Sequence, residues 1–360
     1  MRPDPERFAA LLAGYCLDVQ PGQQVLVRST TQAAPLLLAL QREILEREAW
    51  PAMRVSLPGQ TESYWAAARD VHLDGLAPAE LADTEGSDCL LRIMAPENTS
   101  ELAGVDPARL ARAARTRQPL SELAMQRRWC GTVWPTPAGA QQAGVSTGEF
   151  AALVERALFL DRDDPIAAWG ELHDTQARLI ERLAGASELR IEAEGTDLRL
   201  RVDGRLWVNS DGKRNMPSGE VFTGPLEDSA EGTIRYTIPS SPGGVAVEGI
   251  TLRFEAGRVV EAHAERGEEY LRTTLATDDG ASRLGEIGIG TNFGIDRAVG
   301  AILFDEKIGG TVHLAVGRSY PETGGTNESS VHWDMICDLR QDGRLTADGV
   351  TILENGQFTS

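Results

Sequence analysis

Cysteine is scarce in this chain of 360 residues, which has four of them. They lie at positions 16, 89, 130 and 337, and no two stand at the spacing of a zinc-binding or redox pair. This scatter argues against a disulfide framework and against a zinc site built on cysteine. It favours reduced thiols, and we therefore expect a cytoplasmic protein.

Long apolar runs are also missing, and no segment is apolar enough to cross a bilayer. The opening "MRPDPERFAALLAGYCLDVQPG" is too polar at its flanks for a signal peptide. It is typical of an amphipathic helix with Asp4 as the N-cap, Pro5 in the first turn and an end at Pro21 and Gly22.

Basic residues are fewer than acidic residues in this chain. The chain has 54 acidic and 35 basic residues, which gives a formal net charge of −19. Such a surface repels phosphate backbones and anionic lipid, so we expect neither nucleic acid nor membranes as partners. The excess of carboxylates does not by itself indicate a metal site, because most of these groups must be solvated.

The first half lacks a glycine-rich phosphate loop. Its first strand-to-helix connection, "VRSTTQAAPLL", matches neither nucleotide-binding pattern, so nothing there indicates NAD or ATP. Short apolar segments alternate with helical patterns such as "PARLARAARTR" and "PLSELAMQRR". This alternation predicts a parallel sheet covered by helices. The expected strands are residues 23–29, 52–57, 89–95 and 127–134.

Two further helices are expected before the pattern changes. One covers residues 146–159, where Ser146 and Glu149 form a capping box, and the other covers 164–184. From residue 186 onward apolar and polar residues alternate between tight Gly and Asp turns, as in β-hairpins. We therefore expect an α/β domain at residues 1–185 and a β-rich, largely antiparallel domain at 186–360.

Two of the five histidines stand in one segment, "TVHLAVGRSYPETGGTNESSVHWDM", at residues 311–335. On a strand, His332 and Asp334 would leave the same face, and His313 would point away from its apolar neighbours. An imidazole with a carboxylate suits Zn, Co or Mn better than Mg or Ca. However, a His-x-Asp pair also arises by chance, and a histidine on a strand is often an ordinary hydrogen-bonded residue.

Two glutamates strengthen the case for a metal site. Glu220 in "PSGEVFT" and Glu286 in "RLGEIGIG" are both embedded in apolar, glycine-containing strand patterns. An unpaired buried carboxylate is costly, so such residues are usually paired or coordinated. Each glutamate could instead cap a turn or meet an arginine such as Arg214 or Arg283. Taken with the two histidines and the aspartate, they indicate a ligand set.

Four segments carry a resemblance to a known family: "NMPSGEVFTGP", "LGEIGIGTN", "EKIGGTVHLAVGRSYPE" and "HWDM". In their order and in their residues they resemble the M29 metalloaminopeptidases, that is, thermophilic aminopeptidase T and its relatives. The resemblance is dense over residues 205–340 and fainter across the N-terminal half. It implies an α/β domain followed by a β-rich catalytic domain, a homodimer, and a two-metal hydrolase that removes N-terminal residues from peptides.

Carried over by motif, the resemblance implies five metal ligands: Glu220, Glu286, His313, His332 and Asp334. It places Tyr320 beside the metals, where a phenol could steady a tetrahedral intermediate. It also offers Glu306 as a further ligand, although the gap from Glu306 to His313 is longer than in some relatives.

The chemistry expected of such a ligand set is hydrolysis. Two nearby divalent ions lower the pKa of a shared water from about 16 to about 7, which supplies a hydroxide near neutral pH. A glutamate at the edge of the ions can take the water proton and pass it to the leaving amine. Glu286 is our choice for this general base, and Glu220 is the alternative.

Two other functions fit parts of the pattern. Ring-cleaving dioxygenases with a single iron resemble the family around the C-terminal His/Asp pair but lack the full "GEVFT" wording. The chain could also be an inactive binding homologue, against which the presence of all five ligand positions argues. Two Zn, Co or Mn ions per chain would support the peptidase, and one Fe would support the dioxygenase.

Several residues near the ligand set are expected to be structural. The segment "GIGTNFG" should allow a close turn beside Glu286, because it is not a phosphate loop. We expect Trp333 to pack on the opposite face of its strand and Cys337 to be a small buried residue. Three histidines without a partner at ligand spacing are expected to be structural or solvated: His72, His173 and His263.

Overall fold

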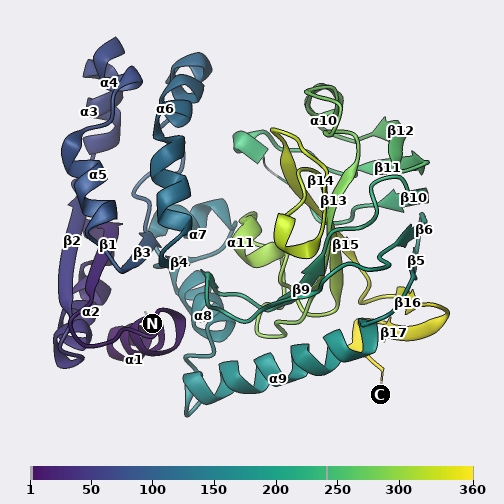
Figure 1. The fold of residues 1–360 in the computed structure, drawn as a ribbon, viewed down its shortest axis with the longest axis horizontal. Coiled ribbons are helices and arrows are strands. Elements are labelled where there is room, and N and C mark those ends of the chain that lie inside the picture. Colours follow the sequence, from purple (N-terminus) through teal and green to yellow (C-terminus); the bar gives the residue numbers. More distant parts are fainter. Residues whose placement is uncertain (1–2, 241, 360) are drawn as a thin grey trace. The chain divides into compact units, whose positions relative to one another are not determined.

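The computed structural model describes residues 3–240 and 242–359 (Figure 1). These residues form two compact units. The first contains the chain up to Ile166 and Gly212–Pro217, and the second contains Ala167–Asp211 and the chain from Ser218. The boundary expected near residue 185 falls at the end of helix α9 (Pro165–Leu183), whereas the units divide near its beginning. Helix α9 goes with the second unit because Leu179 and Leu183 pack into its core.

The first unit contains a five-stranded sheet in which every pair of neighbours is parallel, in the order β2-β1-β3-β4-β8. The parallel sheet predicted from the sequence is therefore confirmed. Its strands are β1 (Gln24–Thr30), β2 (Trp50–Ser56), β3 (Cys89–Met94), β4 (Arg128–Val133) and β8 (Asn215–Met216).

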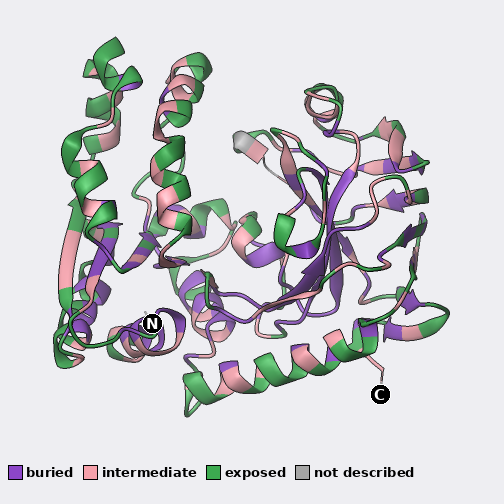
Figure 2. Cartoon of the chain, in the orientation of Figure 1, coloured by how far each residue is buried: buried purple, intermediate pink, exposed green. Residues whose placement is uncertain are grey.

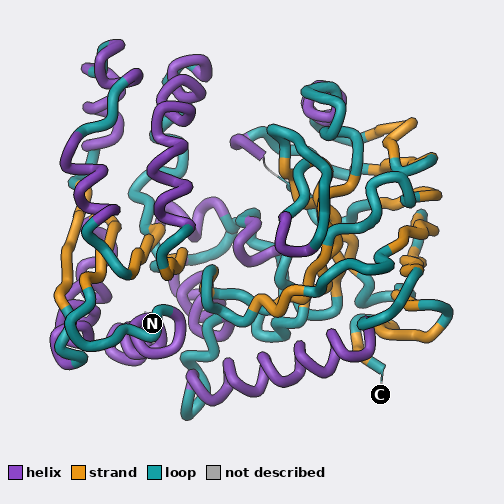
Figure 3. Tube along the Cα trace, in the orientation of Figure 1, coloured by secondary structure: helices purple, strands orange, loops and turns teal. Residues whose placement is uncertain are grey.

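Helices make up most of the rest of the first unit (Figure 3). Asp4 caps the first one by accepting a hydrogen bond from the Glu6 amide at 2.9 Å, and the Ser146–Glu149 capping box is present. The first helix ends at Cys16, earlier than expected, after a π-helical stretch. The helices are α1 (Pro5–Ala10), η1 (Leu11–Cys16), η2 (Thr31–Ala33), α2 (Ala34–Glu46), α3 (Gln60–Ala67), α4 (Asp70–Asp74), α5 (Pro78–Glu85), α6 (Pro107–Met125), α7 (Pro137–Gln142) and α8 (Thr147–Ala157).

The second unit contains two antiparallel sheets. One has eight strands in the order β12-β11-β10-β6-β5-β16-β17-β18, and the other has five in the order β15-β14-β13-β9-β7. The eight strands are β5 (Glu188–Ala193), β6 (Thr196–Arg201), β10 (Glu231–Arg235), β11 (Thr251–Glu255), β12 (Arg258–His263), β16 (Arg344–Ala347), β17 (Val350–Glu354) and β18 (Gln357–Phe358). The five are β7 (Val208–Ser210), β9 (Glu220–Thr223), β13 (Leu284–Gly290), β14 (Thr311–Gly317) and β15 (His332–Asp338). The helical segments are α9, η3 (Pro242–Gly244), α10 (Glu268–Leu275), α11 (Ile302–Asp305) and η4 (Pro321–Thr323).

The core of the second unit lies between these two sheets. Strand β6 contributes Leu198 and Leu200 from one side, and β13 contributes Ile287 and Ile289 from the other. Burying a side chain of this size stabilises the fold by about 1.5–3 kcal/mol. The five-stranded sheet is the most deeply buried part of the unit (Figure 2).

Alternation along three central strands decides which side chains face away from this core. Because neighbours on a strand point to opposite faces, the apolar residues that enter the core leave the intervening residues on the other face. On β13 the core residues flank Gly288, on β14 Val312 and Leu314 flank His313, and on β15 Trp333 and Met335 flank Asp334. The far face of the sheet is thereby free to hold polar groups.

The structure also shows how apolar its helices are and where the four cysteines lie. No helix in the described ranges is long and apolar enough to span a membrane. All four cysteines are buried and none is in a disulfide, and Cys337 lies in the core of the second unit, as expected.

Candidate metal centre

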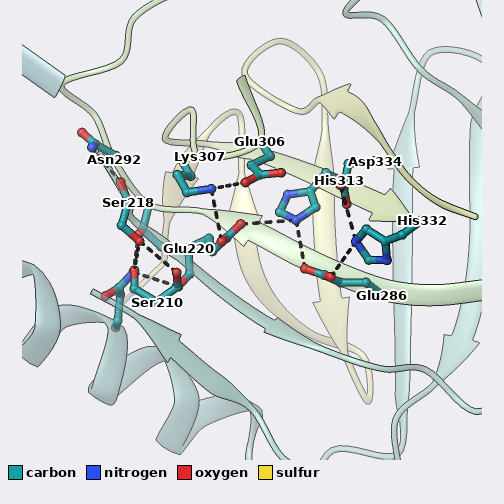
Figure 4. A network of polar contacts seen from close by, with 12 residues as sticks. Ser210, Ser218, Glu220, Glu286, Asn292, Glu306, Lys307, His313, His332 and Asp334 are labelled. Carbon is teal, nitrogen blue, oxygen red and sulfur yellow. Dashed lines mark hydrogen bonds and ion pairs between the residues drawn. The ribbon is translucent and has the colours of Figure 1, made fainter. Parts of the chain in front are cut away.

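Four neighbouring strands bring the five predicted ligands to one face of the five-stranded sheet (Figure 4). Glu220 begins β9 and lies opposite Gly290, and His313 of β14 lies opposite Gly288. On β15, His332 lies opposite Gly317 and Asp334 lies opposite Ala315. Residues far apart in the sequence thus converge because the strands pair in this order.

The donor atoms form two groups that share Glu286. In the first group, His313 Nε2 is 3.4 Å from Glu220 Oε2 and 3.4 Å from Glu286 Oε1. In the second, His332 Nε2 is 3.5 Å from Glu286 Oε2 and 3.5 Å from Asp334 Oδ2. The two oxygens of one carboxylate therefore point to different groups, as Figure 4 shows.

These distances suit a metal ion better than direct hydrogen bonds. They are long for hydrogen bonds between nitrogen and oxygen. Donors held about 2.0–2.1 Å from a tetrahedral ion stand about 3.4 Å apart. Glu220 Oε2 is buried and has no hydrogen-bond partner among the described residues, so an electron pair is left for a cation. Carboxylate oxygens and imidazole nitrogens are donors that Zn, Co and Mn accept.

The glycines of "LGEIGIG" make room for the centre. A Cβ atom on Gly288 would lie 2.1 Å from Cε1 and Nε2 of His313, so no other residue fits beneath the imidazole ring without a shift. A Cβ on Gly290 would similarly lie 2.0 Å from the Ile308 carbonyl oxygen. In the segment "GIGTNFG" the first two glycines belong to strand β13, and the expected turn follows the strand, at Phe293 and Gly294. The strand glycines serve close packing.

Comparison with known proteins decides the family. The profile described as "Thermophilic metalloprotease (M29)" matches residues 2–358. The chain belongs to the M29 family. It is 32% identical over 400 residues to "Aminopeptidase 2" of Geobacillus stearothermophilus, covering 96% of this chain and 94% of that protein.

Other relatives agree with this assignment. "Aminopeptidase T" of Thermus thermophilus is 31% identical over 402 residues, covering 98% of this M29 chain and 96% of its own. The solved structure of wild-type AmpT from Thermus thermophilus matches with a TM-score of 0.83 and 27% identity over 99% of both chains. The expected fold of an α/β part followed by a β-rich part is confirmed. These comparisons support metalloprotease chemistry and not the iron dioxygenase considered from the sequence.

The electrostatics of the M29 centre reflect a surplus of buried acids. Burial raises the pKa of Glu286 and the pKa of Asp334, because a carboxylate loses its hydration. Burial would lower the pKa of His313, but the long hydrogen bond with Glu286, at 3.4 Å, and the charge of Glu220 raise it to about 10. Without an ion the site therefore takes up protons. A divalent cation would supply the same positive charge.

Glu306 and its neighbour Lys307 lie next to the first group. The Lys307 ammonium contacts the Glu306 carboxylate and stands 3.4 Å from Glu220 Oε1. Glu306 belongs to neither group of converging donors. Burial raises the pKa of Glu306 to about 7, despite the charge of Lys307. The sequence motifs did not point to Lys307. Its rarity could have drawn attention to it, since the chain has only two lysines.

Tyr320 lies beside the second group. Its ring centroid is 5.0 Å from that of His332 and 5.7 Å from that of Phe222. Burial and the nearby charges of Glu286 and Asp334 raise the pKa of Tyr320, so the phenol stays protonated and can donate a hydrogen bond. The Arg318 carbonyl in the same loop lies 2.8 Å from His332 Nδ1, which leaves Nε2 directed at the ligand group.

The other residues expected to be structural lie outside both donor groups. Trp333 is in the core, and its indole donates a hydrogen bond to Ser240 Oγ at 2.8 Å. His72 accepts a hydrogen bond from the Arg69 amide, and His173 Nδ1 is 3.0 Å from an oxygen of Asp211. His263 contacts Glu268.

Proposed function

We propose that this chain is an aminopeptidase whose centre holds two divalent ions, one at each donor group. The main observation that supports this proposal is the position of Glu286, which directs one oxygen into each group as a bridging carboxylate would. The M29 relatives named aminopeptidases support the reaction, and the depth of the centre supports a dedicated binding site.

In this proposal Glu220, Glu286 and His313 hold the first ion, and Glu286, His332 and Asp334 hold the second. An N/O donor set of this kind suits Zn, Co or Mn. When bound, such ions lower the pKa of water to about 7 and polarise a peptide carbonyl. The peptide substrates would be those with a free N-terminus.

Two side chains are proposed to act on protons and charge. Glu286 would accept the water proton, with Glu220 as the second choice, because burial raises the pKa of Glu286 and so makes its carboxylate a better proton acceptor. Tyr320 would donate its hydroxyl proton in a hydrogen bond to the oxyanion that forms at the scissile carbonyl. Tyr320→Phe should therefore lower kcat by roughly 10²-fold while the metal content stays that of the wild type.

The compartment and assembly are also proposals. Four buried cysteines outside any disulfide support a reducing compartment, which we take to be the cytoplasm. The family resemblance supports a homodimer. Sedimentation of the purified protein would test the dimer, and a mass of one chain across the working concentration range would refute it.

The central experiment measures metal content and hydrolysis on one purified sample. We expect two Zn, Co or Mn ions per chain and cleavage of aminoacyl p-nitroanilides from a small panel. Nα-acetylated versions of the same compounds serve as the matched control, because they lack the free amine. Cleavage of the acetylated compounds at the same rate, or one iron per chain without hydrolysis, would overturn the proposal.

A further inference from the structure

Lys307 is an unusual residue in this chain. Of the 35 basic residues that are lysine or arginine, 33 are arginine, and the only lysines are Lys213 and Lys307. The Lys307 side chain is fully buried, with 0% exposure. It lies two residues after the end of helix α11, and its backbone forms hydrogen bonds with the Phe304 carbonyl and the Asn292 amide.

A buried ammonium group needs carboxylate partners to offset its loss of hydration. Lys307 has two: Glu306, which it contacts closely, and Oε1 of Glu220 at 3.4 Å. The other oxygen of Glu220, Oε2, faces His313 in the first donor group. The two oxygens of Glu220 therefore have different neighbours, one a fixed cation and the other the metal position.

A lysine at this position can contact one oxygen of Glu220 and leave the other open, which an arginine would not do. The ammonium is a compact point charge at the end of a flexible stem, whereas the guanidinium is a broad fork that takes both oxygens of a carboxylate. An arginine here would compete for Oε2 of Glu220 as well as Oε1. The chain has a lysine at this point although it uses arginine almost everywhere else.

We infer that Lys307 is a positioning residue that reserves one oxygen of Glu220 and the Glu306 carboxylate, so that Glu220 offers a single oxygen to the first ion. This inference rests on the proposed function, because it needs ions at the two donor groups. It has two consequences. The first position keeps coordination sites open for substrate, and the nearby positive charge makes the first position the weaker of the two.

The test compares Lys307→Met with Lys213→Met in the full-length, metal-free protein. Lys213 is the matched control, since its ammonium lies 4.0 Å from the ring centroid of Tyr15 in the first unit. Titration with Zn²⁺ by calorimetry should resolve two binding steps in the wild type. In K307M the weaker step should tighten by about tenfold or more, because a nearby like charge has been removed. K213M should match the wild type in both steps.

A second variant covers the possibility that K307M does not fold. The double variant E306Q/K307M removes one negative and one positive charge together, so the buried charge stays balanced. With Co²⁺ as the probe, its visible absorption should weaken relative to the wild type, because the freed Oε1 of Glu220 raises the coordination number of the first ion. A double-variant spectrum identical to that of the wild type would overturn the inference.

The outcomes separate this inference from the proposed function. If the wild type binds no divalent ion, the proposed two-metal function fails. If the wild type binds two ions and K307M folds with an unchanged weaker step, the role of Lys307 fails and the two-metal function stands. If Glu306 were a metal ligand instead, the charge-balanced variant E306Q/K307M would weaken binding in the weaker step by tenfold or more, which would also overturn the inference.

Discussion

The two five-stranded sheets of this protein differ in strand direction and in what they bury. In the parallel sheet of the first unit, β1 buries the adjacent apolar residues Val25, Leu26 and Val27. In the antiparallel sheet of the second unit, β13 buries isoleucines on one face and Glu286 on the other. Parallel strands covered on both faces are apolar throughout, whereas alternating strands separate an apolar core from a polar face. The alternating sheet can therefore carry chemistry without giving up its core.

The distribution of buried charge follows the same division. Within the described ranges, the charged or histidine side chains that are buried all belong to the second unit: Asp211, Glu220, Glu286, Asp305, Lys307 and His313. Such groups are costly to bury unless they are paired or coordinated. The second unit thus accepts a cost in stability that an ion would offset.

The largest expected effect comes from removing the charge shared by the two donor groups. Glu286→Gln should lower kcat/KM by roughly 10³-fold or more and leave at most one ion per chain, because each group loses a carboxylate oxygen. Glu192→Gln on the outer eight-stranded sheet is the control, since Glu192 pairs there with Arg344. Activity assays and metal analysis check this, and normal turnover in E286Q would refute the shared-carboxylate assignment.

A pair of glycine substitutions tests the two sheets directly. In Gly288→Ala the new Cβ would lie 2.1 Å from the His313 ring, so the ring must move, with a cost of about 1–3 kcal/mol and loss of the first ion. In Gly131→Ala, on β4 of the parallel sheet, the nearest atom would be Asn215 Oδ1 at an ordinary 3.5 Å. Thermal unfolding and metal analysis should show a large change only for G288A. Equal effects in both variants would mean that His313 is not tightly packed.

Metal binding to the second unit should depend on pH. The pKa of His313 is raised to about 10 in the metal-free centre, so the imidazole is protonated at neutral pH. An ion at the first position must displace this proton, and its affinity should therefore rise with pH, by up to about tenfold per unit between pH 7 and 9. Competition titrations with a chelator check the slope. A dissociation constant that does not change over this range would show that His313 is not displaced.

The positions of three of the five predicted ligands could be predicted because they depend on local alternation. On β14 and β15 the apolar residues take every second position, which puts His313, His332 and Asp334 on the face opposite the core. The order of the motifs then indicated that these strands belong to one site. This prediction needed only the two-residue alternation of a strand and recognisable sequence motifs.

The contacts of Lys307 could not be predicted in this way. Its partner Glu220 lies on β9, far away in the sequence, and the contact depends on how the segment after α11 packs against the sheet. The helix α6 is a second example: two separate helical patterns are one helix that continues through Pro119. A proline usually interrupts a helix, and only the tertiary environment decides otherwise.

The smallest expected effect concerns two surface aspartates, one in each unit. Asp83 pairs with Arg54 of the edge strand β2, and this hydrogen-bonded pair lowers the pKa of Asp83. Asp278 accepts hydrogen bonds from the Ser330 amide and the Ser329 hydroxyl just before His332, and they lower the pKa of Asp278 to about 2. Each variant, Asp83→Asn or Asp278→Asn, should reduce the thermal midpoint slightly at neutral pH.

The two variants should differ in activity and agree in the sign of their pH dependence. Only Asp278→Asn should lower kcat, by about twofold, because Asp278 fixes the loop that leads into the strand carrying His332. A carboxyl group whose pKa is lowered in the fold contributes stability above its unfolded pKa of about 4 and loses it as the pH falls toward the folded pKa. The difference in midpoint between D278N and the wild type should therefore shrink between pH 6 and about pH 3. If it stays constant, the hydrogen bonds to Asp278 do not depend on its charge, and the loop is held by packing alone.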